Sequence, residues 1–274
     1  MTALSRGAAD LLVSEAASRA VAEAAPDLVY HLAAQASVAQ SFERPAETLH
    51  ANVTMALNLL EAVKEHAPAA RVVVAGSGEV YGPPASLPLE EEHRLRPQNP
   101  YAVSKAATDL LAGYYADAQG LDVVRARSFN HFGPGQSDVY VIASLARQLA
   151  AARLAGERPA RIVTGNADVR RDFTDVRDVV GAYRALARAP SGAYNVCSGT
   201  APSIAELLER LGELARWEVD HVVDPDLVRE HEVLEVRGSH AKLTAATGWE
   251  PEIPLDRTLA DTLEWWTEQL SRDA

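Results

Sequence analysis

Three short, uninterrupted apolar runs constrain the fold of this chain more than any other feature of its sequence. The runs are DLVYHLAA, RVVVAGS and LDVVRARSFN. Each has the length and composition of a strand that is buried on both faces of a parallel sheet. Segments with helical spacing near 15–25, 48–65 and 98–116 precede or separate the runs. This alternation predicts an α/β fold with a doubly wound parallel sheet, whose ligands bind at the carboxyl ends of the strands.

The second half of the chain continues the alternation less regularly. Helical spacing is found in VIASLARQLAAARLAG, VRDVVGAYRALAR, SIAELLERLGELAR and PLDRTLADTLEWWTEQL, and strand character in RIVTG and GAYNVCS. Ser203 is the expected N-cap of the third of these helices, and a polar, proline-containing stretch covers 220–238. We expect residues 1–135, with parts of 160–200, to form the sheet domain. Residues 136–274 would supply its remaining elements and a small lobe over its carboxyl edge.

The composition excludes several classes of protein. The 274 residues carry a formal net charge of −12, which opposes attraction to nucleic acid or to an anionic membrane. The single cysteine, Cys197, has no partner for an internal disulfide, and no Cys/His cluster has the spacing of a metal site. The chain shows no apolar run of about 18 residues and no secretory leader. We therefore expect a globular, cytoplasmic protein without a metal, nucleic-acid or membrane partner.

A tyrosine and a lysine stand four residues apart at the start of one predicted helix. Tyr101 and Lys105 would therefore lie on one helix face, where the ammonium would lower the pKa of the phenol and make it an acid/base for carbonyl or alcohol chemistry. Ser77 would end the preceding strand and share a substrate oxygen with Tyr101. Either motif alone is typical of an ordinary helix surface or turn, so the prediction rests on their combination.

Several segments in order resemble the extended short-chain dehydrogenases/reductases, which are NAD(P)-dependent epimerases, dehydratases and reductases of nucleotide sugars. The resemblance covers nearly the whole chain and is carried by DLVYHLAAQASV, SGEVYG, NPYAVSKAATDLL, RSFNHFGPGQ, RRDFTDVRDVV, YNVCSG and TGWEPEIPLDRTLADTLEWW. It implies a Rossmann-like NAD(P)-binding domain and a C-terminal substrate-binding lobe. FNHFGPGQ and GNADVRRDFTDVRDVV are more similar to GDP-4-keto-6-deoxymannose reductases than to GDP-mannose 4,6-dehydratases.

The resemblance assigns catalytic roles to four residues. Ser77, Tyr101 and Lys105 match the family's catalytic triad, in which the lysine also binds the nicotinamide ribose. Glu79 matches the base of sugar-nucleotide 4,6-dehydratases, although similar reductases carry a glutamate there too, and it could be a solvated loop carboxylate. Gly78 departs from the Asp that glucose-type dehydratases use as general acid, which argues against that subgroup.

The resemblance also implies a set of cofactor-binding residues. Asp10 and Leu11 match the pair that contacts adenine, although Asp10 could instead be a helix N-cap. Ala33, Ala34 and Gln35 match the segment that lines the pyrophosphate and ribose. Whether the cofactor is NAD or NADP stays open, because the discriminating residue normally follows a strand that this sequence lacks. The remaining residues implied for the cofactor are Asn52, Tyr101, Lys105 and His131.

For the substrate, the resemblance points to donors for a diphosphate. Asn130 matches a diphosphate contact, and Arg171 matches the arginine of the motif RRDFTD. Arg229 with Glu232 resembles an Arg-Pro-x-Glu nucleotide clamp in which Glu230 replaces the proline. Arginine suits this task because its fork binds phosphate oxygens in pairs, but a surface ion pair is the alternative. The other residues implied for the substrate are Ser37 and Ser77.

The family's glycine-rich turn, G-x-x-G-x-x-G, is not found in this sequence. The fold is therefore expected to be N-terminally truncated, without its first two strands, which would leave DLVYHLA as an unpaired apolar edge. Three explanations stay open: a start site placed too late, a chain trimmed at its front, and a genuine loss that abolished activity.

Three functions remain open from the sequence. The first is reduction of a GDP-4-keto-6-deoxyhexose with Tyr101 as proton donor. The second is a GDP-mannose 4,6-dehydratase or a nucleotide-sugar epimerase with tightly held NAD⁺, which Glu79 favours. The third is a non-catalytic protein that binds nucleotide sugars. The resemblance further implies a homodimer, joined through the Tyr101 helix and the helix over 48–65, but the sequence does not fix the sugar or the product stereochemistry.

Overall fold

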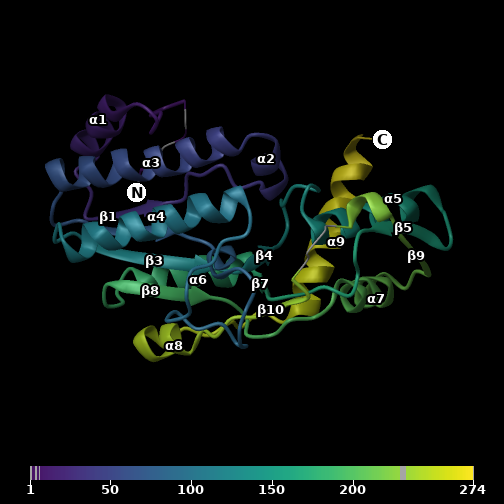
Figure 1. Ribbon diagram of the computed structural model, residues 1–274. Coiled ribbons are helices and arrows are strands. Elements are labelled where there is room, and N and C mark those ends of the chain that lie inside the picture. Colours follow the sequence, from purple (N-terminus) through teal and green to yellow (C-terminus); the bar gives the residue numbers. More distant parts are fainter. Residues whose placement is uncertain (1, 4, 6, 229–232, 274) are drawn as a thin grey trace.

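A four-stranded parallel sheet forms the centre of the larger body of the molecule (Figure 1). The computed structural model describes residues 2–3, 5, 7–228 and 233–273. The strands lie in the order β1 (Leu28–His31), β2 (Arg71–Ala75), β3 (Asp122–Ser128) and β8 (Gly192–Val196). All three neighbouring pairs are parallel, which confirms the predicted α/β class.

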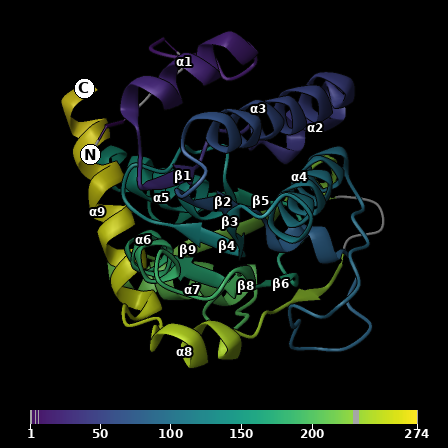
Figure 2. The same cartoon turned by 90° about the vertical axis from the view of Figure 1, so that its left-hand side faces the viewer.

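Helices cover both faces of this sheet (Figures 1 and 2). The helices α1 (Ser14–Ala24), α3 (Pro45–His66) and α4 (Pro100–Asp117) lie on one face. On the other face lie α6 (Val176–Leu186) and α8 (Ala241–Thr247). This arrangement is the doubly wound layering that the alternation of runs and helices predicts.

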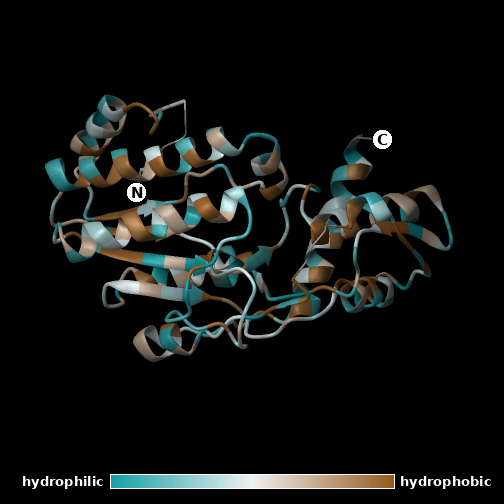
Figure 3. Cartoon of the chain, viewed as in Figure 1, coloured by the Kyte–Doolittle hydropathy of each residue, from teal (hydrophilic) through white to brown (hydrophobic). Residues whose placement is uncertain are grey.

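The valines of β2 show why both faces are covered. Val72 and Val74 pack with apolar residues of α1, α3 and α4, whereas Val73 packs with those of α6 and α8. Successive side chains of a strand point to opposite faces, so an uninterrupted apolar run needs a helical layer on each side. Figure 3 shows a hydrophobic stretch in the neighbouring strand β3, which lies beneath helices of mixed character.

A second, smaller body holds the remaining long helices (Figure 1). Here α5 (Val141–Ala155), α7 (Ile204–Ala215) and α9 (Leu255–Asp273) pack around the parallel strand pair β5 (Ala160–Thr164) and β9 (Val219–Val223). Ser203 caps α7 through a capping box with Glu206, as the sequence predicts for that serine. The stretch 220–238, expected only as polar, contains most of β9.

Short elements connect the two bodies along the carboxyl edge of the main sheet. Two parallel strand pairs, β4 with β7 and β6 with β10, bring the segment after β3 and the strand β10 together with residues 170–175. The short elements are β4 (Asn130–Phe132), β6 (Arg170–Arg171), β7 (Phe173–Asp175), β10 (Glu235–Val236), α2 (Val38–Glu43), η1 (Gly78–Tyr81) and η2 (Pro225–Leu227).

Strand β1 forms one edge of the main sheet, as the sequence predicts for DLVYHLA. Within the part of the chain that the structure describes, β1 pairs only with β2. Its side chains Leu28 and Tyr30 are each 37% exposed, and Leu32, directly after the strand, is 61% exposed. An exposed apolar edge strand is a surface on which another strand can add.

Candidate active site

The first turn of α4 places Tyr101 and Lys105. The side chain of Asn99 caps this helix by accepting a hydrogen bond from the backbone N–H of Ala102 at 2.8 Å, and Pro100 occupies the first helical position. Tyr101 follows at once, and Lys105 lies one turn further on the same face. Local sequence chemistry therefore fixes where both side chains begin.

Ser77 lies on the neighbouring element, directly after β2. It is buried, and its hydroxyl accepts a hydrogen bond from the backbone N–H of Glu79 at 3.2 Å, which caps the short helix η1. The Ser77 side chain is also a hydrogen-bond partner of the Tyr101 phenol. The structure thus brings together Ser77 and Tyr101, as the sequence predicts.

Lys105 is buried at the carboxyl end of β2. Its side chain is held by a hydrogen bond from Nζ to the carbonyl oxygen of Ala75 at 2.9 Å, and only 6% of the residue is exposed. Burial lowers the pKa of Lys105 to about 8. The neighbouring His31, at the end of β1, is equally buried, and burial together with the Lys105 charge lowers its pKa to about 4.

The prediction that the pKa of the Tyr101 phenol is lowered is wrong. Burial raises the pKa of Tyr101 to about 12, and the charge of Glu79 adds to this rise, while the hydrogen bond with Ser77 opposes it. The helix spacing indicates a positive charge one turn away, but it does not indicate the desolvation of the phenolate, which raises the pKa. At neutral pH the Tyr101 hydroxyl is therefore protonated and can donate a proton.

Glu79 is not a freely solvated carboxylate. Its Oε2 accepts a hydrogen bond from the Asn99 side chain at 3.1 Å, so the residue that caps α4 also holds Glu79. The preceding Gly78 packs against the ring of Phe129, and a Cβ at position 78 would lie 3.0 Å from that ring. An aspartate at this position would have to displace the ring, which gives a steric reason for the glycine.

The predicted cofactor segment after β1 is held by Asn52 of α3. The side-chain oxygen of Asn52 accepts a hydrogen bond from the backbone N–H of Gln35 at 2.7 Å. Its Nδ2 donates to the carbonyl oxygen of Gln35 at 3.1 Å and to the hydroxyl of Ser104 on α4 at 2.8 Å. Gln35 Oε1 is buried and has no partner among the described residues. Ser37 caps α2 by accepting from the backbone N–H of Gln40. Asn52 therefore orders the segment that carries Ala33, Ala34 and Gln35.

The predicted adenine pair lies just before α1. The Asp10 carboxylate accepts a hydrogen bond from the backbone N–H of Leu12 at 3.0 Å, and the Leu11 carbonyl accepts from the side chain of Asn58 at 2.8 Å. The N-cap of α1 is Val13, so the alternative that Asp10 is that cap is wrong. Both residues remain candidates for the adenine contact.

Two predicted substrate residues, Asn130 and Arg171, and the predicted cofactor residue His131 lie on the short strands at the carboxyl edge. Asn130 on β4 donates to the carbonyl oxygen of Asp172 at 3.4 Å, and the ring of His131 contacts the carbonyl oxygen of Phe129. Arg171 on β6 donates to the carbonyl oxygen of Arg170 at 2.9 Å. Arg229 and Glu232, predicted as a nucleotide clamp, lie outside the described residues.

Sequence reasoning missed the buried carboxylate of Asp172. Its oxygens accept hydrogen bonds from the backbone N–H groups of Ser198, Gly199 and Gly238, at 2.8, 3.0 and 3.1 Å, and from the Ser198 hydroxyl at 2.7 Å. Asp172 therefore ties the end of β8 and the segment after β10 to the strand that carries Arg171. An acidic residue between an arginine and a phenylalanine, Arg171 and Phe173, was the available signal.

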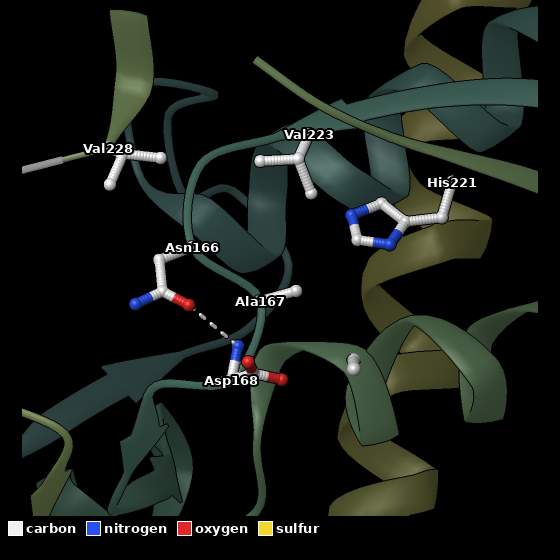
Figure 4. Close-up of a pocket in the computed structure, with 7 residues that line it drawn as sticks. Asn166, Ala167, Asp168, His221, Val223 and Val228 are labelled. Atoms are coloured by element: carbon white, nitrogen blue, oxygen red, sulfur yellow. Dashed lines mark hydrogen bonds between the residues drawn. The ribbon is translucent and has the colours of Figure 1, made fainter. Parts of the chain in front are cut away.

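The smaller body contains a hollow of its own (Figure 4). It has a volume of about 440 Å³ and includes residues after β5 and on β9. Asn166 Oδ1 accepts from the backbone N–H of Asp168 at 3.1 Å, and the His221 ring bonds the Thr164 hydroxyl at 2.7 Å. In the described part of the chain, no group of His, Cys, Asp and Glu side chains could hold a metal ion. No described helix is long and apolar enough to cross a membrane.

A doubly wound sheet that brings a serine, a tyrosine and a lysine together at its carboxyl edge defines a short-chain dehydrogenase/reductase. Within this class, the family model described as GDP-mannose 4,6 dehydratase matches residues 4–262. The chain belongs to this family, which confirms the resemblance drawn from the sequence motifs.

Curated relatives include several kinds of nucleotide-sugar enzyme. GDP-6-deoxy-D-mannose reductase of Pseudomonas aeruginosa is 44% identical over 252 residues, which cover 90% of this chain and 83% of that protein. GDP-mannose 4,6 dehydratase 1 of Arabidopsis thaliana is 32% identical over 85% of this chain and 65% of that protein. The family thus contains both reductases and dehydratases.

Solved structures agree with this placement. The structure described as RMD from Pseudomonas aeruginosa complexed with NADPH matches with a TM-score of 0.89 at 43% identity, over 95% of this chain and 88% of that one. A UDP-glucose 4-epimerase of Thermus thermophilus in complex with NAD matches with a TM-score of 0.83 at 30% identity, over 94% and 83% of the two chains.

Proposed function

We propose that this protein is an NAD(P)-dependent oxidoreductase that reduces a GDP-4-keto-6-deoxyhexose. The observation that carries the proposal is the protonated phenol of the half-buried Tyr101 beside Ser77. Reduction of a ketone needs a proton donor at the carbonyl oxygen, and a phenol whose pKa is about 12 is such a donor at neutral pH. The 44% identity to a GDP-6-deoxy-D-mannose reductase supports the choice of substrate class.

The chain's own residues account for the proton side of the reaction. The Ser77 hydroxyl donates a hydrogen bond to the carbonyl oxygen of the sugar and orients it toward Tyr101. When hydride reaches the carbonyl carbon, the carbon–oxygen π electrons move to oxygen, and this oxygen takes the Tyr101 proton. Lys105, buried one helical turn away, supplies positive charge that stabilises the transient phenolate. The nicotinamide cofactor supplies the hydride.

The residues near Tyr101 fit the nicotinamide and ribose end of a dinucleotide. Lys105 Nζ is bonded to the Ala75 carbonyl and keeps further donors for ribose hydroxyls. Gln35 Oε1 is a buried acceptor without a partner in the described chain. Ala33 and Ala34 carry small side chains that let a ligand approach the backbone. We propose NAD or NADP as the cofactor, and relatives hold both NADPH and NAD.

We propose that the diphosphate of the substrate is bound at the carboxyl edge by Asn130 and Arg171. The net charge of −12 makes a local guanidinium necessary for an anionic ligand. Arg171 is half-buried on β6, which crosses between the two bodies. Arg229 and Glu232 remain sequence-based candidates for the nucleotide.

We also propose a homodimer formed through α3 and α4. Their outer surface carries Leu57, Val103, Leu110 and Tyr114, and the last two are 64% and 52% exposed. Contiguous exposed apolar side chains on a pair of packed helices are typical of a protein interface. We place the protein in the cytoplasm, because its single cysteine suits a reducing compartment.

Two alternatives follow from specific observations. The tether between Glu79 and Asn99 holds a carboxylate where a dehydratase base is expected, and dehydratases are among the relatives. A dehydratase or epimerase would keep its nicotinamide cofactor through purification, because the hydride returns to the substrate in each cycle. A non-catalytic protein would bind the nucleotide sugar but not NADPH.

The test is to incubate the protein with NADPH and GDP-4-keto-6-deoxymannose and to follow loss of reduced cofactor. Stoichiometric oxidation of NADPH with formation of a GDP-deoxyhexose supports the proposal. Consumption of GDP-mannose without added cofactor would instead indicate a dehydratase. Calorimetry with NADPH and GDP-mannose separates the third alternative, and no oxidation of NADPH with several nucleotide-linked keto sugars would end the reductase proposal.

A further inference from the structure

The candidate active site is built from two elements that the chain separates by a long loop. Ser77 and Glu79 follow β2, whereas Tyr101 and Lys105 lie on α4. The loop 83–99 that joins them contains no regular helix or strand. In the proposed reaction, Ser77 and Tyr101 contact the same substrate oxygen. The reaction therefore depends on contacts that keep η1 and α4 in a fixed position relative to each other.

A buried guanidinium on β3 makes such contacts with α4. Arg127 donates from Nε and Nη2 to the two carboxylate oxygens of Asp109, at 3.0 and 2.8 Å. The side chains of both partners are almost completely buried, at 6% and 1% exposure. Asp109 lies on the α4 face of Tyr101 and Lys105, one turn beyond the lysine. The paired bonds fix both the position and the rotation of α4 against the sheet.

The remaining nitrogen of the same guanidinium holds η1 and the loop. Arg127 Nη1 donates to the hydroxyl of Tyr81 at 3.0 Å and to the carbonyl oxygen of Glu91 at 2.9 Å. Tyr81 ends η1, and its hydroxyl donates in turn to Asn195 Oδ1 on β8 at 2.6 Å. The guanidinium carbon also lies 5.2 Å from the centre of the Tyr81 ring. One side chain therefore contacts both halves of the site.

We propose that Arg127 is a positioning residue, which sets the placement of Ser77 relative to Tyr101 by joining Tyr81 of η1 to Asp109 of α4. The proposal rests on the proposed reductase function for its kinetic readout. A lysine at this position keeps the charge but lacks the fork, so it can bond one of the two elements well but not both. If Ser77 and Tyr101 shift relative to each other by a fraction of an ångström, turnover falls, while the keto sugar and NADPH still bind as before.

The kinetic test compares two variants with a matched control. Tyr81→Phe removes one hydroxyl and keeps the ring, and Arg127→Lys removes the fork. Tyr194→Phe is the control, because it removes a tyrosine hydroxyl that bonds the carbonyl oxygen of Pro190 at 2.9 Å, outside this network. We expect kcat to fall about 10-fold in Tyr81→Phe and about 100-fold in Arg127→Lys. The KM for the keto sugar and the Kd for NADPH should stay within about 2-fold, and the control should keep wild-type kcat.

A second readout needs no substrate and therefore separates failure of this inference from failure of the proposed function. The chain has only three lysines, Lys64, Lys105 and Lys242, so ¹³Cε-lysine NMR resolves each of them. Wild-type Lys105 should titrate near pH 8. If Tyr81→Phe loosens α4, water reaches Lys105 and its pKa rises toward the ordinary lysine value of 10.5, whereas the control leaves it unchanged.

Two results would overturn the inference. One is a Tyr81→Phe variant whose kcat equals that of the wild type, while its melting temperature falls by the same amount as that of Tyr194→Phe. The other applies if the wild type reduces no keto sugar: an unchanged Lys105 titration in Tyr81→Phe would then show that the network is structural only.

Discussion

At the scale of single residues, burial decides the proton chemistry of this site. The spacing to Lys105 suggests an acidic Tyr101, yet desolvation raises the pKa of the phenol to about 12. The same desolvation lowers the pKa of Lys105 to about 8 and that of His31 to about 4. Sequence spacing places Tyr101 and Lys105 on one helix face, but it does not reveal how much water reaches their side chains.

The buried His31 should make the fold sensitive to acid. Its pKa falls from 6.5 to about 4 on folding, so between these values the unfolded chain binds a proton that the folded chain does not. Folding stability should therefore decrease as the pH falls from about 6.5 to 4, by roughly 2 to 3 kcal/mol from this residue. Urea denaturation at several pH values measures this: the His31→Asn variant should lose roughly 2 to 3 kcal/mol less folding stability than the wild type between pH 6.5 and 4.

His50 offers the matched control, because it is an exposed histidine on α3. The His50→Asn variant should lose stability in acid in parallel with the wild type. If His31→Asn shows the same acid dependence as the wild type, His31 is not held neutral in the folded protein.

At the scale of elements, Asn99 joins two functions in one side chain. Its Oδ1 caps α4, and its Nδ2 holds Glu79, so the start of the helix and the loop carboxylate are fixed together. The sequence predicts this helix, but it does not predict the tether, because Glu79 and Asn99 are brought together only by the folded loop. The strand β9 was not predicted either, since VDHVV shows no regular alternation of polar and apolar residues and forms a strand only beside β5.

Removal of the Asn99 side chain should therefore affect stability and activity together. Asn99→Ala should cost about 1 kcal/mol of stability through the lost cap, as should Ser203→Ala at the N-terminus of α7. Only Asn99→Ala should also lower kcat, since α7 lies in the smaller body, away from Tyr101. Chemical denaturation and steady-state kinetics of both variants measure this, and equal kcat values in the two would show that the tether has no catalytic role.

At the scale of the whole molecule, the sequence predicted the sheet and its layers because buried parallel strands leave uninterrupted apolar runs. It also predicted that Ser77, Tyr101 and Lys105 lie at the carboxyl edge of the sheet, where ligands of doubly wound sheets bind. In the structure Ser77 follows β2 and Lys105 bonds the Ala75 carbonyl at the end of that strand. Buried polar partners were harder: nothing in LDVVRARSFN shows that Arg127 points inward to Asp109. Such pairs depend on which face of a strand meets which helix.

The proposed dimer gives a prediction at this scale. Leu110 is 64% exposed at the proposed interface on α4, and a charge there would have to be desolvated on association. Leu110→Asp should shift the protein from dimer to monomer in light scattering. Leu154→Asp, at a 50% exposed leucine on α5 of the smaller body, should remain dimeric. A wild type that is monomeric at micromolar concentration would contradict the proposed interface.

The central claim is that the Tyr101 hydroxyl donates the proton during reduction of a keto sugar. Its most direct test is the single-turnover rate of NADPH oxidation with GDP-4-keto-6-deoxymannose in the wild type and in Tyr101→Phe, with NADPH binding measured for both by calorimetry. The account predicts similar NADPH affinity and a rate at least about 1000-fold lower in the variant. A Tyr101→Phe protein that reduces the sugar at the wild-type rate would contradict it.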